Sequence, residues 1–274
     1  MKIWGHRIAI VPVVGMTIGL GSPLGGLLGN SVAWADGTGQ GQAEPFSAPP
    51  IVAPIVAPLG ASVLSGWQAP EGIGDYPEHI RKTPFGYLRW QRFPVRVAIE
   101  PVLESPGSAA AERDQRWVAA VRGAIADWQP YFPLVEVTAE SRSGQGQNLE
   151  GTNLEQKDLH ERGEWDIYVA RSRPPLQRLP DGTILPARFA DARYEILSPP
   201  SGGDPVKFRF RIRLGNQQGE AGLRATARHE LGHALGLWGH STHPEDVMYP
   251  TQMGNYPPIS DRDLKTLQWL YSAP

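Results

Sequence analysis

The 274-residue sequence contains no cysteine. A scaffold held together by disulfides is therefore excluded, and so is a site in which a thiolate binds or blocks a metal ion. Neither sign of charge is in large excess, since 26 Lys and Arg stand against 28 Asp and Glu and leave a net charge of −2. We therefore expect no nucleic-acid partner, because such proteins usually carry a strongly basic surface.

Long apolar runs are missing beyond the N-terminus. Residues 8–28 are apolar, follow two basic residues and precede the small-x-small sequence Ala33-Trp34-Ala35. This pattern predicts a signal peptide over residues 1–35 that is removed after Ala35. The alternative, an uncleaved membrane anchor, is disfavoured by the Gly and Pro residues within the segment. We expect a secreted protein, extracellular or periplasmic, with no stable membrane anchor after cleavage.

The composition changes again after the expected signal peptide. Residues 36–79 are rich in Gly, Pro, Ala and Gln and include a tandem repeat of Ile-Val-Ala-Pro. A segment of this composition buries too little apolar surface to order itself, so we expect a linker or a short pro-segment. The remaining length suits one folded domain, which we place at residues 80–274.

Periodic patterns in this domain predict an α/β fold. Apolar residues recur at helical spacing over residues 108–128, which indicates a long amphipathic helix. We expect strands at residues 92–99, 134–138, 165–170, 187–197 and 206–214. The last strand alternates apolar with basic residues, and its basic face is expected to be solvated rather than to contact acidic substrate. These basic residues are Lys207, Arg209, Arg211 and Arg213.

The most informative segment reads His-Glu-Leu-Gly-His-Ala-Leu-Gly-Leu-Trp-Gly-His and begins at His229. Residues four apart on a helix lie one above the other, so His229 and His233 can bind one metal ion. Gly236 can end the helix with left-handed backbone, after which the chain can return with His240 as a third ligand. Three protein ligands leave a fourth position open, as in catalytic zinc sites, and Glu230 can take a proton from water held there.

The motif is followed by Asp-Val-Met-Tyr-Pro, centred on Met248. Together these sequences resemble the metzincin zinc peptidases, in which a methionine turn lies under the metal, and most closely the matrixin-type branch. Residues 259–271 are similar to that family's last helix, and Ser260 and Asp263 predict a capping-box-like start for it. Asp263 also matches the Asp that supports the methionine turn, whereas Arg262 replaces an Asp. The resemblance implies a twisted mixed sheet, a long backing helix, a zinc-binding helix and a small C-terminal lobe.

One departure from the matrixin pattern concerns the third ligand. The pattern places this histidine three residues after Gly236, but Gly239 is inserted here and His240 comes four residues after. His243 is an alternative ligand and Asp246 a more remote one. We favour His240, because an extra glycine can be absorbed as a bulge, whereas His243 precedes a proline in a turn-like sequence.

The resemblance implies a zinc-dependent endopeptidase with one catalytic zinc ion and Glu230 as general base. It also implies protein or peptide substrates, such as those of an extracellular matrix, held along the sheet edge at residues 187–197. We expect a monomer, and calcium is a candidate second metal. Its candidate ligands are the loop residues Asp181, Asp191 and Asp204. The alternatives are a zinc-stabilised binding module without catalysis and a zinc amidase that acts on cell-wall peptides.

Overall fold

The computed structural model describes residues 63–137, 165–184, 187–198, 200, 205–250 and 256–272. The expected signal peptide, the first part of the expected linker and the candidate calcium ligand Asp204 lie outside these residues. Within the described part of the chain, none of the helices combines the length and the apolar character needed to span a membrane.

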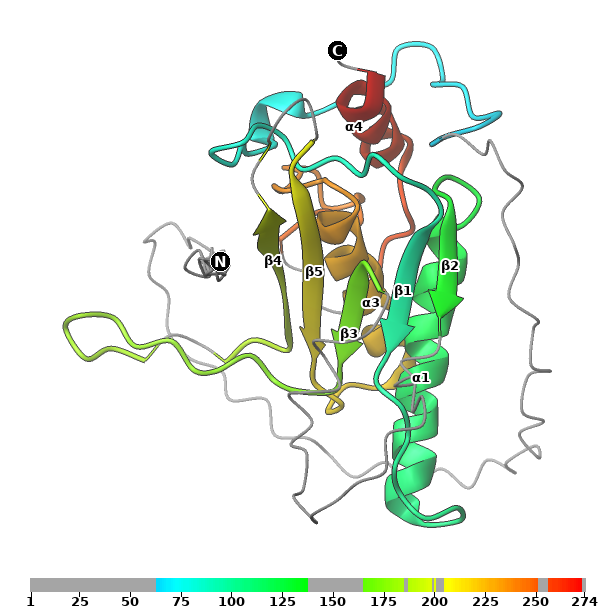
Figure 1. The fold of residues 1–274 in the computed structure, drawn as a ribbon, viewed down its shortest axis with the longest axis vertical. Coiled ribbons are helices and arrows are strands. Elements are labelled where there is room, and N and C mark those ends of the chain that lie inside the picture. The colour runs from blue at the N-terminus through cyan, green and yellow to red at the C-terminus, as the bar shows by residue number, and fades with distance from the viewer. Residues whose placement is uncertain are drawn as a thin grey trace, which may run out of the picture.

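The domain is built on one five-stranded mixed sheet (Figure 1). Its strands are β1 (Val95–Ile99), β2 (Leu134–Val137), β3 (Ile167–Ala170), β4 (Ala190–Ser198) and β5 (Lys207–Leu214). Their spatial order is β2-β1-β3-β5-β4, and only β4 runs antiparallel to its neighbour among these described strands. The α/β fold and its five strands are therefore confirmed, with slightly different strand ends, and β4 lies at an edge of the sheet.

Two helices pack together on one face of the sheet (Figure 1). α1 (Ala109–Trp128) begins where the Ser108 hydroxyl accepts a hydrogen bond of 3.1 Å from the first turn, as an N-cap does. α3 (Glu220–Ala234) packs against α1, β4 and β5. The indole N–H of Trp128 donates to the Arg228 carbonyl (2.9 Å), so a polar contact as well as apolar packing joins the two helices.

α4 (Asp261–Ser272) lies at one end of the molecule (Figure 1). It starts with the reciprocal cap that the sequence predicts. The Ser260 N–H donates to Asp263 Oδ2 (2.9 Å), and the Asp263 N–H donates to Ser260 Oγ (3.1 Å). Its buried apolar residues are Leu264, Leu267 and Leu270. The cap and this apolar face fix the helix against the rest of the domain.

The face of the sheet that the helices leave uncovered carries paired charges. Arg209 on β5 binds Glu195 on β4, with 2.7 Å between Nε and Oε2, and Arg213 on β5 binds Asp191 on β4. These residues stand opposite each other in the antiparallel register. Two of the four basic residues of β5 are therefore paired across the strands rather than fully solvated, because acidic residues of β4 occupy the matching positions; Arg211 stands opposite Arg193 and Lys207 opposite Ser198.

Packing begins before the boundary expected after residue 79. Leu64 and Tyr76 are buried in the main core, and the Leu64 N–H donates to the Tyr131 carbonyl (2.7 Å). A short 3-10 helix, η1 (Pro77–His79), follows and contacts α4. The boundary itself stays a prediction, but residues on its N-terminal side belong to the same core.

Candidate metal centre

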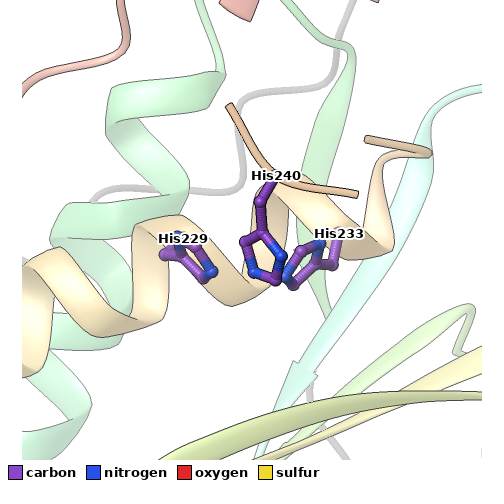
Figure 2. A group of neighbouring side chains, drawn as sticks. All are labelled: His229, His233 and His240. Carbon is purple, nitrogen blue, oxygen red and sulfur yellow. The ribbon is translucent and has the colours of Figure 1, made fainter. Parts of the chain in front are cut away.

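Three histidines converge around the C-terminal end of α3 (Figure 2). His229 and His233 project from the helix, and His240 projects from the segment that follows it. One ring nitrogen from each lies within 4.8 Å of the other two, and within the described ranges no other such group of potential metal ligands occurs. The alternative ligand His243 is exposed and lies outside the group. The structure thus brings together the three residues that the sequence favours as ligands.

The turn after α3 directs the chain back toward the helix. Gly236 has a φ of 112°, and its N–H donates to the His233 carbonyl (3.1 Å). The next N–H, that of Leu237, donates to the Gly232 carbonyl (3.0 Å). These two bonds form the Schellman pattern that ends many helices at a glycine. The helix end predicted at Gly236 is confirmed, and it brings His240 near the other two rings.

Backbone carbonyls orient two of the rings. His229 Nδ1 lies 2.7 Å from the Val247 oxygen, and His233 Nδ1 lies 2.8 Å from the Leu237 oxygen. Because a carbonyl only accepts, each Nδ1 carries the proton and each Nε2 presents its lone pair. This donor set fits zinc. Neutral imidazole nitrogens are common zinc ligands in tetrahedral sites, with Zn–N bonds of about 2.0–2.1 Å, and the three rings here bring theirs within 4.8 Å of one another.

Burial keeps the three imidazoles neutral. Desolvation lowers the pKa of His229 to about 4. Desolvation and the neighbouring charges of His229 and Arg81 lower the pKa of His240 to about 3. The pKa of His233 is also lowered, first by desolvation and then by the other two histidines. A metal ion binds neutral imidazole, so these rings need to lose no proton before binding at neutral pH.

Glu230 is buried next to His229 on α3. Burial, followed by the negative charge of Asp191, raises the pKa of Glu230 to about 8, while Arg188 and the backbone of Ala192 on β4 act on its carboxylate in the opposite direction. A carboxyl group with a pKa this close to neutrality is suited to both accepting and releasing a proton.

Met248 is fully buried against α3, as expected for a methionine turn. A Cβ atom at Gly232 would overlap the Met248 sulfur and lie 3.2 Å from the Trp128 ring, so the turn packs closely on the helix between the two ligands. The Ser241 N–H donates to the Met248 carbonyl (3.0 Å). Met248 therefore contributes packing and a backbone acceptor next to the segment that carries His240.

Asp263 on α4 holds the residue that precedes Met248. Its Oδ2 accepts a hydrogen bond from the Val247 N–H (2.9 Å), while the Val247 carbonyl faces the His229 ring. Asp263 is fully buried. One carboxylate therefore supports both the turn and, through it, the first histidine, which agrees with the role that the resemblance implies for Asp263.

Arg262 forms a contact that the sequence did not predict. Its guanidinium binds the fully buried carboxylate of Asp246, with 3.0 Å between Nε and Oδ1. The Ser241 hydroxyl donates to the same carboxylate. Asp246, considered as a remote metal ligand, therefore has other partners and lies outside the histidine group. The basic residue that replaces a family Asp becomes the partner of this carboxylate.

The carboxylates considered for calcium do not gather in the described part of the chain. Asp181 is exposed and accepts a hydrogen bond from the Thr183 N–H (2.8 Å). Asp191 binds Arg193, with 3.0 Å between Oδ2 and Nε, and also binds Arg213. A calcium site stays a prediction, because no cluster of carboxylates among the residues with described positions supports it.

Part of this chain is similar to known proteins. The model of a family described as Matrixin matches residues 98–272, which is more than half of the chain and includes the three histidines and Met248. Human matrilysin is 53% identical over 49 residues, a segment that covers 16% of this chain and 18% of the human protein. The chain thus matches less than a fifth of that relative's length. The family match confirms the resemblance that the zinc-type motif predicts.

Proposed function

Because this chain belongs to the matrixin family of zinc metalloendopeptidases, we propose that it hydrolyses internal peptide bonds with Glu230 as general base. His229, His233 and His240 would hold the zinc ion. The observation that supports this most strongly is the convergence of three histidines, two of which have their Nδ1 atoms fixed on carbonyls. Such an arrangement leaves a position for water beside a buried carboxyl group.

The roles of the residues follow from their chemistry. When bound here, zinc would lower the pKa of a coordinated water and polarise the scissile carbonyl. Glu230 takes the proton of the attacking water and returns it to the leaving amide nitrogen. Its burial next to His229 excludes bulk water from this transfer. General acid–base catalysis of this kind typically contributes about 10²–10⁴-fold to the rate.

We propose that β4 holds the substrate. It is an edge strand of the sheet, with β5 on its other side. α3 packs against β4, and Asp191 and Ala192 in the first half of this strand act on the pKa of the Glu230 carboxyl group, which supports a general base beside the strand. A peptide that adds to the edge as a further strand would gain main-chain hydrogen bonds and pass the base.

We propose that the pocket for substrate side chains on the C-terminal side of the cleaved bond, the primed-side pocket, lies between α3 and the segment that follows Met248. Part of that segment, residues 251–255, lies outside the described residues. Beyond it, the Pro257 carbonyl accepts a hydrogen bond of 2.6 Å from the Arg228 guanidinium. Arg228 is itself bound to Asp127 on α1, with 3.0 Å between Nη1 and Oδ2. These contacts support a wall for the pocket that is tied to both helices.

We further propose that the protein is secreted and acts as a monomer. Matrixins are generally secreted. The N-terminal sequence supports export, with cleavage after Ala35 to an extracellular or periplasmic product. Mass spectrometry of the mature N-terminus tests the cleavage site, and a start at Met1 in the exported protein would contradict it.

The metal and the base can be tested separately. His233→Ala should abolish zinc binding, because two remaining ligands rarely hold the ion, and elemental analysis measures this. Glu230→Gln should keep the zinc and lower turnover by about two to four orders of magnitude. The control is His243→Ala, which changes an exposed residue outside the group and should keep both zinc and activity. Full zinc occupancy in His233→Ala, or full activity in Glu230→Gln, would overturn the proposal.

Two other functions could use the same metal site. A binding module without catalysis would contain zinc but hydrolyse no unfolded protein; the presence of a buried Glu230 opposes this function. A zinc amidase would cleave cell-wall peptides instead of proteins. Digestion of a denatured proteome and of peptidoglycan fragments, side by side, distinguishes these two functions from the proposed endopeptidase.

A further inference from the structure

A segment that precedes β1 crosses the turn carrying the third histidine. We call this segment, residues 76–90, the strap, and the turn, residues 234–240, the ligand loop. The two segments run antiparallel. Trp90 Nε1 donates to the Ala234 oxygen (2.9 Å), and Leu88 lies against Gly236. Toward the other end of the loop, the Arg81 N–H donates to the Trp238 oxygen (3.0 Å), and His79 lies against Gly239. In Figure 1 the strap leads from η1, which contacts α4, toward the start of β1. It therefore follows the ligand loop over most of its length.

Gly239 is the tightest point of this crossing. A Cβ atom at this position would overlap the carbonyl oxygen of His79 and lie 2.8 Å from the His79 carbonyl carbon and 3.3 Å from Ile80 Cα. The backbone of Gly239 is not in the left-handed region, so glycine is required here for space and not for conformation. Gly239 is the residue inserted relative to the matrixin spacing, directly before His240. The insertion therefore coincides with the place where the strap touches the loop.

We propose that the strap positions the third zinc ligand, with Gly239 as the seat on which the backbone of His79 rests. This inference rests on the proposed metal site. The Arg81 N–H gives the Trp238 carbonyl a partner from outside the loop, whereas the N–H groups of Trp238 and Gly239 bond within the loop. The contact with the strap thus fixes the direction of the backbone immediately before His240. His79, Ile80 and Arg81 are positioning residues that act through the loop.

The N-terminal end of the strap is anchored to the support of the first ligand. The Tyr76 hydroxyl donates to Asp263 Oδ1 (2.6 Å), and the Tyr76 N–H donates to Thr266 Oγ1 (3.0 Å). The other oxygen of Asp263 holds Val247, whose carbonyl orients His229. Tyr76 is buried, so these contacts are shielded from water. The position of the strap is therefore linked to both ends of the histidine triad.

The first test adds one methyl group at the seat. Gly239→Ala should weaken zinc binding by about 10- to 100-fold, as is typical when the support of a ligand is lost. Competition with a chelator of known affinity measures the dissociation constant. The matched control is Gly74→Ala, at a position with open space and ordinary backbone. This substitution should change the dissociation constant for zinc by about twofold or less. Unchanged zinc affinity in a folded Gly239→Ala protein would overturn the inference.

A second pair of variants separates positioning from a general loss of stability, and applies even if Gly239→Ala fails to fold. Ile80→Ala removes from the strap the same side-chain atoms that Ile99→Ala removes from β1, and both side chains are buried in the core. The cobalt-substituted proteins should then differ. Only Ile80→Ala should weaken the visible absorption of tetrahedral cobalt, because His240 is displaced. Equal spectra for the two variants would contradict a positioning role.

The wild-type protein distinguishes the two levels of inference. If it binds no zinc at the three histidines, the proposed function fails. If it binds zinc but the two variants within each pair behave alike, the metal site stands and only the role of the strap is overturned.

Discussion

The floor beneath the histidines and the rim beside β4 are held in different ways. The floor, formed by Trp238, Val247 and Met248, is fully or almost fully buried, and its backbone groups bind partners from three other segments. The rim is formed by residues 171–184 and 187–189, which extend away from the sheet in Figure 1. Its large apolar side chains are open to solvent. Their exposed fractions are 62% for Leu176, 41% for Leu179, 51% for Ile184 and 47% for Phe189.

The contacts at the tip of the rim are local, unlike those of the floor. The Leu179 N–H donates to the Thr183 oxygen (2.8 Å), and the Gly182 N–H donates back to the Leu179 oxygen (2.9 Å). The tip of the rim is thus ordered by its own turn. A metal ion needs donors that are fixed before it arrives, whereas a rim that meets different polypeptides gains from adaptable contacts. The difference between the two regions matches these two demands.

The largest effect should follow from removing the carboxylate that joins the segments of the floor. Asp263→Ala leaves Tyr76 and Val247 without acceptors, and each buried unsatisfied donor costs about 1–3 kcal/mol. We expect a loss of about 3–5 kcal/mol in the free energy of unfolding, measured with urea. Asp261→Ala, an exposed residue in the first turn of the same helix, is the control and should cost about 0.5 kcal/mol. Similar losses in both variants would contradict the central role of Asp263.

A second effect concerns the protonation of the histidines above the floor in the metal-free protein. The unfolded chain takes up protons on its histidines below about pH 6.5, whereas folded His229 and His240 resist protonation down to about 4 and 3. Folding stability should therefore fall as the pH drops from 6.5, at about 1–2 kcal/mol per pH unit. Urea unfolding in the presence of a chelator measures this slope. A stability independent of pH in this range would contradict the buried, neutral histidines.

Glu230 acts in the opposite direction at higher pH. Its ordinary pKa of 4.5 is raised to about 8 in the folded state, so between these values the folded protein holds a proton that the unfolded chain lacks. This contribution to stability is lost as the pH rises toward 8. The metal-free protein should thus be most stable near pH 6.5. Glu230→Gln should remove the decline above that pH, and persistence of the decline would assign it to another group.

The smallest effect on stability is expected at the rim. Leu179→Ser combined with Ile184→Ser changes exposed side chains and should alter the free energy of unfolding by less than about 0.5 kcal/mol. If the rim contacts long substrates, kcat/KM on an unfolded protein should fall about threefold, equivalent to ~0.6 kcal/mol, with no change on a short peptide. Leu103→Ser, at a 72% exposed position before α1, is the control. Equal losses on both substrates would exclude such a contact.

Local sequence features predicted the geometry of the triad well. The spacing of His229 and His233 fixes their relation on a helix, and Gly236 marks the helix end because few other residues adopt its backbone conformation. The cap formed by Ser260 and Asp263 also depends only on residues three apart. Each of these predictions needs only neighbouring residues, whose geometry is set by the helix itself.

Long-range support could not be predicted in the same way. Tyr76 and Asp263 are 187 residues apart, and the Pro- and Gly-rich sequence before Tyr76 gave no period that would indicate packing. The acceptors at Val247 and Leu237 are backbone oxygens, which every residue type has. In the sequence, Arg262 was recognisable only as a replacement of a family Asp. Its partner Asp246 could not be predicted, because the contact depends on how α4 packs on the rest of the domain.

The link from Asp263 through Val247 to His229 also sets an order in time. Chain synthesis delivers the strap first, the three histidines much later and α4 after them. A nascent chain that ends before Asp261 already has every metal ligand but has no partner for the Val247 N–H. The Tyr76–Asp263 contact spans 187 residues and forms slowly, because a long loop of chain must close before it gives any stabilisation. An unfinished chain therefore carries the three histidines without the carboxylate that holds Val247, and the support of the metal site is complete only when α4 has been made.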